Sequence, residues 1–478
     1  MEQKIYSIEM GAAKCAVDLG DGSERGEYVD QDYILHKMGR PHRAISLMYC
    51  YYPLDKTWPV RARDAFADQE VSFQWDYPYD DYFTYKGGIG GTTDGEPFTC
   101  MKDVRRHGQD VILTMTIDPN LTDDYLIKIA QELRTYGRMQ LRINHEATGN
   151  WFSFTKRATY QQIADFYVRF HNIIKKEAPN VSTILCIGGV EHPEKGGEIE
   201  MEKEFADAVR ATDIWSVDKY MSLHWGWPYD VAEVGGTSFG RSKVSDIYNL
   251  TKLSQKRYKE LCGGVQKPMV MSEFNADGDV TGPYDQAAMV KEFCDMLKAD
   301  GEDWFSGFTF YQFRDRGRLG LEIQDPNYAD CGIEQPVMKT YKEIIHDDFF
   351  KPAMTRGDEV TLPCTLRWGG SEDAEGLEIP LHFEKNPHFC EVIFDDDSNI
   401  MMEINGKWFY KSPEAKTIDL MAAFFEKPLE GEADLTLRLF APPASGENDL
   451  SIEDGLMNSY TEIKKLPNIR IRFEPVEL

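Results

Sequence analysis

The sequence predicts an α/β fold, a (β/α)₈ barrel followed by a C-terminal β-sandwich. A length of 478 residues suits a barrel of roughly 250 to 350 residues with one smaller domain. Between residues 43 and 350, short apolar runs alternate with helix-like segments, which is typical of parallel α/β domains. After residue 351 the apolar period shortens to that of strands. We therefore divide the chain into an N-terminal segment (1–42), a barrel (43–350) and a sandwich (351–478).

The barrel strands are expected where short apolar runs occur between helical segments. Eight such runs are present, which is the number that closes a barrel. In chain order they are Ala44–Cys50, Val71–Trp75, Val111–Ile117, Met139–Ile143, Thr183–Ile187, Ile214–Val217, Met269–Ser272 and Gly307–Tyr311.

The helices between these strands show apolar residues at helical spacing. Thr159 and Gln162 form a capping-box pattern before the apolar stripe that runs from Ile163 to Ile174. A second stripe follows Thr122, and a third helix is expected over Gln286–Ala299.

The C-terminal region reads as alternating strands separated by turn signals such as Asn405–Gly406. This pattern predicts a β-sandwich. A strand is also expected near Lys4–Glu9, and by analogy with other barrel enzymes it could pack with the sandwich. The sandwich strands are expected at Val360–Leu366, Leu377–Phe383, Glu391–Phe394, Met401–Ile404, Leu435–Phe440 and Ile469–Phe473.

The composition excludes several classes of protein. With 42% hydrophobic and 28% charged residues the chain is globular, and its formal net charge of −28 disfavours nucleic acid and anionic membranes as partners. The nine cysteines are scattered without metal-ligand spacing, which favours a reducing compartment. Neither a signal peptide nor an apolar window for a membrane span is apparent, so we expect a cytoplasmic protein, with export of a trimmed form as the alternative.

Two predicted strands end in a glutamate. The fourth leads into Asn144-His145-Glu146, and the seventh ends at Ser272-Glu273. In a (β/α)₈ barrel the carboxyl ends of the strands form the active-site face. Either glutamate alone could be a solvent-facing strand end or part of a structural ion pair. As a pair on strands four and seven they could flank one bond.

Two such carboxyl groups are the requirement of a glycosidase. In a retaining enzyme they lie about 5–5.5 Å apart; one protonates the leaving oxygen and the other attacks the anomeric carbon. The acid must be protonated near neutral pH, and the charge of its neighbour raises its pKa. We expect Glu146 to be the acid/base and Glu273 the nucleophile.

The segment Arg142-x-x-His145-Glu146-x-x-Gly149-x-Trp151-Phe152 resembles glycoside hydrolase family 26, a member of the clan A retaining barrel hydrolases. The segment from Ile214 to Tyr220 and the glutamate that ends strand seven are similar to the same family. The resemblance implies a retaining hydrolase acting on β-mannan or β-glucan. This chain departs from the family after the acid/base, where Ala147-Thr148 replaces the common Met-Asn, and mannan is therefore not assured as the substrate.

The resemblance also implies roles for the neighbouring residues. His145 would bind the sugar or position Glu146, and Arg142 would keep Glu273 ionised. Tyr220 would donate a hydrogen bond to Glu273, and Trp151 would line the subsite beside the cleaved bond. The structural alternatives are a core histidine, an internal salt bridge and core packing.

Further candidates lie on loops at the same face. Trp75 and Trp225 belong to aromatic-rich loops that could hold sugar rings, and Asp118 could bind a sugar hydroxyl. Glu191 is a competing carboxylate, and the end of strand eight, Phe310–Phe313, would form the floor.

Two other functions remain open at this point. A carbohydrate-binding barrel without activity would keep the aromatic residues but lose a catalytic carboxylate. A metal-dependent barrel hydrolase needs clustered His and Asp at strand ends, and the sequence has neither HxH nor HExxH. We expect a carbohydrate substrate, no cofactor and no metal; the sequence does not indicate an oligomeric state.

Overall fold

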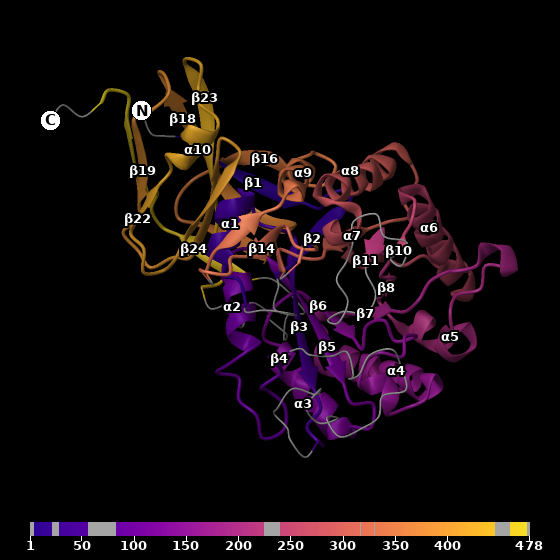
Figure 1. The fold of residues 1–478 in the computed structure, drawn as a ribbon. Coiled ribbons are helices and arrows are strands. Elements are labelled where there is room, and N and C mark those ends of the chain that lie inside the picture. Colours follow the sequence, from indigo (N-terminus) through magenta and orange to yellow (C-terminus); the bar gives the residue numbers. More distant parts are fainter. Residues whose placement is uncertain are drawn as a thin grey trace.

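A computed structural model describes residues 4–21, 28–55, 83–223, 240–315, 317–328, 330–444 and 459–475. It consists of a (β/α)₈ barrel and a β-sandwich that lies against it (Figure 1). Among the described helices none is long and apolar enough to cross a bilayer.

Eight parallel strands of the described chain close the barrel, because β2 pairs with both β12 and β3. In order around the barrel they are β2 (Ala16–Gly20), β3 (Ala44–Tyr51), β5 (Asp110–Ile117), β6 (Met139–Ile143), β7 (Val181–Cys186), β8 (Ile214–Ser216), β11 (Met269–Phe274) and β12 (Gly307–Phe310). The predicted fold class is thereby confirmed.

The first strand differs from the prediction. β2 lies before residue 43, so the barrel begins inside the segment that we had separated from it. Its sequence, Ala-Val-Asp-Leu-Gly, is short and carries a buried Asp18, which hides it from a search for apolar runs. The predicted strand Val71–Trp75 lies outside the described residues. Strands four to eight keep their predicted order.

Helices follow the strands and cover the barrel. They are α1 (Gln31–Met38), α2 (Phe98–Arg106), α3 (Asp123–Leu133), α4 (Tyr160–Glu177), α5 (Glu202–Ala211), α6 (Val244–Leu261), α7 (Gly278–Thr281), α8 (Pro283–Ala299) and α9 (Pro336–Ile345). The capping box predicted at Thr159 is present in both directions. Short elements between them are β4 (Phe83–Thr84), η2 (Phe154–Lys156), η3 (Pro193–Lys195), β9 (Ser222–Leu223), β10 (Gly240–Arg241), β13 (Arg314–Asp315), β14 (Glu322–Gln324) and β15 (Gly332–Glu334).

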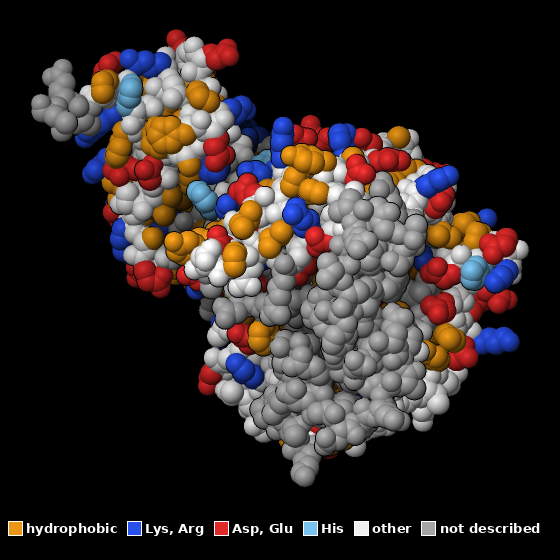
Figure 2. All heavy atoms as spheres, viewed as in Figure 1, with side chains coloured by type: hydrophobic (Ala, Val, Ile, Leu, Met, Phe, Trp, Pro, Cys, Tyr) orange, Lys and Arg blue, Asp and Glu red, His pale blue; other side chains and the backbone are white. Residues whose placement is uncertain are grey.

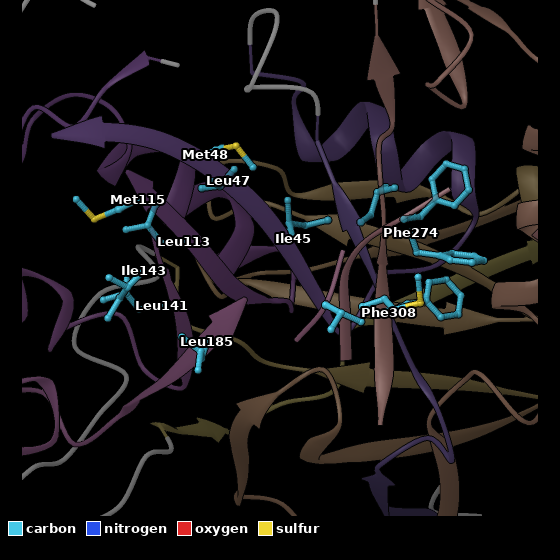
Figure 3. Close-up of a cluster of buried hydrophobic side chains, with 14 of the residues drawn as sticks. Ile45, Leu47, Met48, Leu113, Met115, Leu141, Ile143, Leu185, Phe274 and Phe308 are labelled. Atoms are coloured by element: carbon cyan, nitrogen blue, oxygen red, sulfur yellow. The ribbon is translucent and has the colours of Figure 1, made fainter. Parts of the chain in front are cut away.

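The barrel strands are held by an apolar core that continues from one strand to the next. Figure 3 shows buried side chains from β3, β5, β6 and β7, among them Leu47, Leu113, Leu141 and Leu185. Such long apolar runs are expected of parallel strands that are covered on both faces. The strand ends therefore form a rigid frame for the residues that follow them.

The sandwich has two antiparallel sheets. The larger contains β1 (Ile5–Gly11), β16 (Ala353–Val360), β17 (Cys364–Gly370), β18 (Asp373–Phe383), β20 (Ile400–Ile404), β21 (Lys407–Lys411), β23 (Ala433–Phe440) and β24 (Ser459–Ile463). The smaller contains β19 (Phe389–Ile393), β22 (Thr417–Asp419) and β25 (Asn468–Arg472), and α10 (Ala422–Glu426) lies beside them. β1 pairs with β16 and β18, so the N-terminal strand is part of this sheet.

One predicted sandwich strand is wrong. Val360–Leu366 spans the end of β16 and the start of β17, with Pro363 in the turn between them. Proline fixes its φ angle and has no N–H to donate to a neighbouring strand, so it interrupts the pairing that the apolar pattern suggested.

The middle of the larger sheet is buried on both faces. Met402 lies in the core between the two sheets, whereas its neighbour Met401 joins Trp368 and Trp408 in a second cluster with Leu35 of α1 and close to Gly108, after α2. Polar contacts add to this interface: Ser371 donates to the carbonyl of Arg43 (2.7 Å), and Asn399 donates to that of Arg106 (2.8 Å).

These contacts involve segments that lead into β3 and β5, at the amino ends of the barrel strands. The sandwich therefore covers part of the barrel face opposite to the carboxyl ends of the strands. On the outside of the molecule, Figure 2 shows acidic and basic side chains interspersed with single hydrophobic ones. Such scattered hydrophobic side chains are normal on a protein surface.

Trp368→Ala should destabilise the protein by about 3–5 kcal/mol, because it empties the centre of the interface between sandwich and barrel. The free energy of unfolding in a denaturant titration measures this effect. Tyr460→Ala is the matched control, since Tyr460 lies on the same sheet but is 55% exposed and should change stability by about 0.5 kcal/mol or less. Equal losses in the two variants would contradict the assigned interface.

Candidate active site

The carboxyl ends of β6, β8 and β11 bring together a compact group of charged residues. Arg142 lies on β6, Glu146 follows that strand, Asp218 and Tyr220 follow β8, and Glu273 lies on β11. One carboxylate oxygen from each of Glu146, Asp218 and Glu273 lies within 4.8 Å of the other two. Three acids from distant parts of the chain thus meet in one place.

The guanidinium of Arg142 is buried beneath this group and connects it to the barrel. It donates to Glu273 (2.8 Å), to Asp218 (3.0 Å) and to the hydroxyl of Thr114 on β5 (2.8 Å). Hydrogen bonds between a cation and a carboxylate are stronger than those between neutral groups. Because its side chain is only 1% exposed, Arg142 supplies a positive charge that solvent hardly screens.

Both carboxylate oxygens of Glu273 are engaged. Oε1 accepts from Arg142, and Oε2 accepts from the hydroxyl of Tyr220 (2.6 Å). The imidazole Nε2 of His145 lies 3.8 Å from Oε1. Hydrogen bonds and a nearby cation favour the ionised form of a carboxyl group and fix its orientation.

Glu146 is held by an unusual turn at the end of β6. Its φ angle is +50° and that of Asn144 is +45°, a region that residues other than glycine seldom adopt. The side chain of Asn144 bonds both the N–H and the carbonyl of Ile117 on the next strand (2.6 and 3.1 Å). The indole N–H of Trp151 then donates to the Glu146 carboxylate (2.9 Å). The turn and this bond together aim Glu146 at Glu273.

The surroundings of Glu146 favour its protonated form. Burial, and then the negative charges of Glu273 and Asp218, raise its pKa well above the usual value, although the Trp151 hydrogen bond and Arg142 act in the opposite direction. Removing a carboxylate from water and placing it beside like charges both penalise ionisation. These surroundings therefore extend the protonated form of Glu146 to higher pH than for an ordinary glutamate.

The other two ionisable groups follow the same physical rules. Burial and the charge of Glu273 raise the pKa of Asp218 to about 7. Burial and the charge of Arg142 lower the pKa of His145 well below its usual value, so its imidazole is neutral. His145 also packs on the ring of Phe152, with 4.5 Å between the ring centroids.

Sequence reasoning missed two members of the group. Asp218 accepts from Arg142 and from the N–H of Glu273 (3.0 Å each), and the thiol of Cys186 at the end of β7 donates to it (3.1 Å). Asp218 stood inside the segment that resembled the known family, two residues before Tyr220. Nothing in the spacing of Cys186 pointed to the site, because the contact is made only across neighbouring strands.

Other candidates lie around this centre. Asp118 follows β5 directly, and its carboxylate pairs with Arg157 (2.8 Å), which also binds Asp55. Glu191 is exposed and pairs with Lys219. Whether Asp118 contacts a sugar stays a prediction. Trp75 and Trp225 lie outside the described residues.

The donor set fits acid–base chemistry better than a metal ion. Among the described residues, Glu146, Asp218 and Glu273 are the one group of three ligand-type side chains within reach of a common ion. It contains no histidine, and the guanidinium of Arg142 already bonds two of its members. A cation placed there would be repelled by Arg142.

Comparisons with known proteins give likenesses of fold. No family model and no curated protein matches the sequence. Similar solved structures include a modular endo-β-1,4-mannanase of glycoside hydrolase family 26 from Cellulomonas fimi, with 12% identity over 94% of both chains and a TM-score of 0.43. A glucosidase from Croceicoccus marinus has 10% identity over 91% of this chain and 96% of its own (TM-score 0.45). An α-L-arabinofuranosidase from Thermotoga maritima has 10% identity over 91% and 100% (TM-score 0.42). At these values, function has to be argued from the site itself.

Glu273→Gln should lower the pKa of Glu146, because the negative charge of Glu273 is one of the causes that raise it. A ¹³C NMR titration of carboxyl-labelled glutamate measures the change, and Glu146→Gln assigns the resonance. An unchanged Glu146 titration in Glu273→Gln would show that the two carboxyl groups are not electrostatically coupled.

Proposed function

We propose that this chain is a retaining glycoside hydrolase that cleaves glycosidic bonds by double displacement through a covalent glycosyl-enzyme. The observation that carries this proposal is the separation of Glu146 and Glu273, whose carboxylate oxygens lie within 4.8 Å. Retaining enzymes place these groups about 5–5.5 Å apart, whereas inverting enzymes need about 6.5–9.5 Å to admit a water molecule between them.

Glu273 is the nucleophile. The hydrogen bonds from Arg142 and Tyr220 fix both of its oxygens, so that the carboxylate is oriented before the substrate arrives. Orienting a reacting group in advance removes part of the entropic cost of the reaction. In the first step, a Glu273 oxygen bonds to the anomeric carbon while the bond from that carbon to the leaving oxygen breaks.

Glu146 is the acid and then the base. Its raised pKa supplies the proton that the leaving oxygen takes up as its bond breaks. Once Glu273 is esterified, its negative charge no longer acts on Glu146, and the Glu146 pKa falls. Glu146 can then accept a proton from the water that attacks the anomeric carbon and releases Glu273.

The raised pKa of Glu146 determines how the reaction rate should depend on pH. The first step needs Glu146 protonated, and a raised pKa extends the protonated form to higher pH. The kcat/KM value is therefore expected to fall as the pH rises through the pKa of Glu146.

For the substrate we propose a β-linked polysaccharide or oligosaccharide of the β-mannan or β-glucan type. The support is the resemblance of the segment from Arg142 to Phe152 to glycoside hydrolase family 26. The replacement at Ala147-Thr148 lies directly after the acid/base, where most members of that family have Met-Asn, so mannan itself is not specified. A cytoplasmic location, proposed from the scattered cysteines, would suit a substrate of oligosaccharide size.

A carbohydrate-binding barrel without activity is the alternative from another class. It would have no use for a buried carboxyl group whose pKa is raised, which is aimed by a strained turn and placed beside a second carboxyl group. Strained backbone and shifted pKa values concentrate at reactive sites. These two features favour an enzyme.

Glu273→Ala should reduce kcat by roughly 10⁴-fold or more, since it removes the nucleophile of a covalent mechanism. Added azide should restore turnover of an aryl glycoside and yield a glycosyl azide of inverted configuration, which NMR identifies. Glu177→Ala, at the end of α4 and away from the strand ends, is the control and should keep full activity. Turnover by Glu273→Ala without azide would refute the nucleophile assignment.

Glu146→Ala should discriminate between leaving groups. A natural sugar leaving group needs its proton, so kcat/KM should drop by roughly 10²–10⁴-fold, whereas a dinitrophenyl glycoside should be nearly unaffected in the same parameter. Comparing kcat/KM isolates the first step from the later role of Glu146 as base. Equal losses on both substrates would contradict the acid role.

A further inference from the structure

The end of barrel strand eight carries two buried polar groups without a hydrogen-bond partner among the described residues. Tyr311 is 4% exposed and Gln312 is 1% exposed. Within the described part of the chain, neither the hydroxyl of Tyr311 nor the amide nitrogen of Gln312 has a hydrogen-bond partner. Both residues follow β12 directly, at the carboxyl ends of the barrel strands.

Such groups are costly to a folded protein. Nearly all buried polar atoms in native proteins are hydrogen-bonded, and each exception needs an explanation. Phenylalanine at position 311 and leucine at position 312 would avoid the cost with little change in shape. Polar residues in these places indicate that their bonds are made to something other than the folded chain.

The location indicates what that partner is. Tyr311 and Gln312 line a small pocket together with Asp21, Ser46 and Arg142, the residue that bonds Glu273. The ring of Tyr311 also packs edge-on against Tyr220, with 6.0 Å between the centroids and an angle of 89°. The two residues therefore lie next to Arg142 and Tyr220, the residues that hydrogen-bond Glu273.

We infer that Tyr311 and Gln312 bind hydroxyl groups of the sugar ring that Glu273 attacks. The inference rests on the proposed function and specifies how that site recognises its substrate. One hydroxyl of the sugar accepts a hydrogen bond from the Gln312 amide, and a second sugar hydroxyl forms a hydrogen bond with the Tyr311 hydroxyl. Asp21 and Ser46, on the same wall, offer oxygen acceptors for the hydroxyl protons.

This arrangement favours recognition by hydrogen bonds over stacking at the floor of the site. An aromatic platform binds the apolar face of a sugar and tolerates changes in its hydroxyl groups. A floor of amide, hydroxyl and carboxylate groups instead rejects a sugar that lacks one of its hydroxyls, because a buried group is then left unpaired. The enzyme is thus expected to be most specific for the sugar that lies next to Glu273.

The test compares three variants that each remove one buried, unbonded polar group: Tyr311→Phe, Gln312→Leu and Tyr341→Phe. Tyr341 is the matched control, since its hydroxyl also has no partner among the described residues, but it packs against Phe310 on the helix side of β12 and is absent from the pocket. Removing an unpaired group should leave the melting temperature unchanged or raise it in all three.

Activity should separate the variants. With the best substrate from a panel of p-nitrophenyl β-glycosides, kcat/KM should fall roughly 3- to 15-fold in Tyr311→Phe and in Gln312→Leu, the loss expected for one hydrogen bond. Tyr341→Phe should be unchanged. For each of these two variants there should be one monodeoxy analogue of that glycoside on which kcat/KM equals that of the unmodified enzyme. That analogue lacks the hydroxyl that the replaced side chain binds.

Unchanged kcat/KM in both Tyr311→Phe and Gln312→Leu would overturn the inference while leaving the proposed function intact. A loss of kcat/KM that persists on every deoxy analogue would also overturn the inference. The same holds if the variants that lose activity melt at a lower temperature than the Tyr341→Phe variant does. If the unmodified enzyme turns over none of the glycosides and a fluorosugar trap does not label Glu273, the proposed function fails and this assignment fails with it.

Discussion

The buried guanidinium of Arg142 is the interaction on which the rest of the site depends. It is one positive charge among the three carboxyl groups of Glu146, Asp218 and Glu273. A buried charge is tolerated only when it is paired and hydrogen-bonded. One cation cannot compensate three anions in a site shielded from water, so protons must remain on some of the acids. Burial and the charge of Glu273 raise the pKa of Glu146, whereas Glu273 accepts hydrogen bonds from the guanidinium and from Tyr220. The division of roles between the two glutamates follows from this imbalance of charge.

The barrel makes this charge group possible because it fixes the strand ends. Thr114 on β5 accepts from the same guanidinium, and Asn144 ties the end of β6 to Ile117 on β5. These bonds connect the site to strands whose apolar side chains are closely packed (Figure 3). The sandwich touches the opposite ends of the strands. Among the described residues, the sandwich therefore supports the barrel from the opposite end and supplies no side chain to the site.

Much of this arrangement could be predicted from the sequence, and the exceptions share a cause. Strands four to eight have contiguous apolar runs, so the two glutamates could be assigned to the correct strand ends. β2 escaped because it is short and contains Asp18, and the Val360–Leu366 strand was misplaced because Pro363 interrupts an apolar pattern. Asp218 and Cys186 were missed because their role depends on contacts between neighbouring strands. Local patterns report the burial of a strand, but not which polar groups meet at its end.

The negative charge of the site also bears on the reaction itself. The transition state of glycoside cleavage resembles an oxocarbenium ion, so the sugar becomes positively charged as the bond to the leaving group breaks. In the proposed mechanism the carboxylate of Glu273 lies at that point, and Asp218, whose pKa is about 7, adds part of a negative charge. Such charge stabilises the transition state more than the neutral substrate. The same field opposes the entry of a sugar that carries a carboxylate, and the net charge of −28 acts in the same direction over a longer range. For the substrate position that we propose beside Tyr311 and Gln312, the electrostatic field thus favours a neutral sugar.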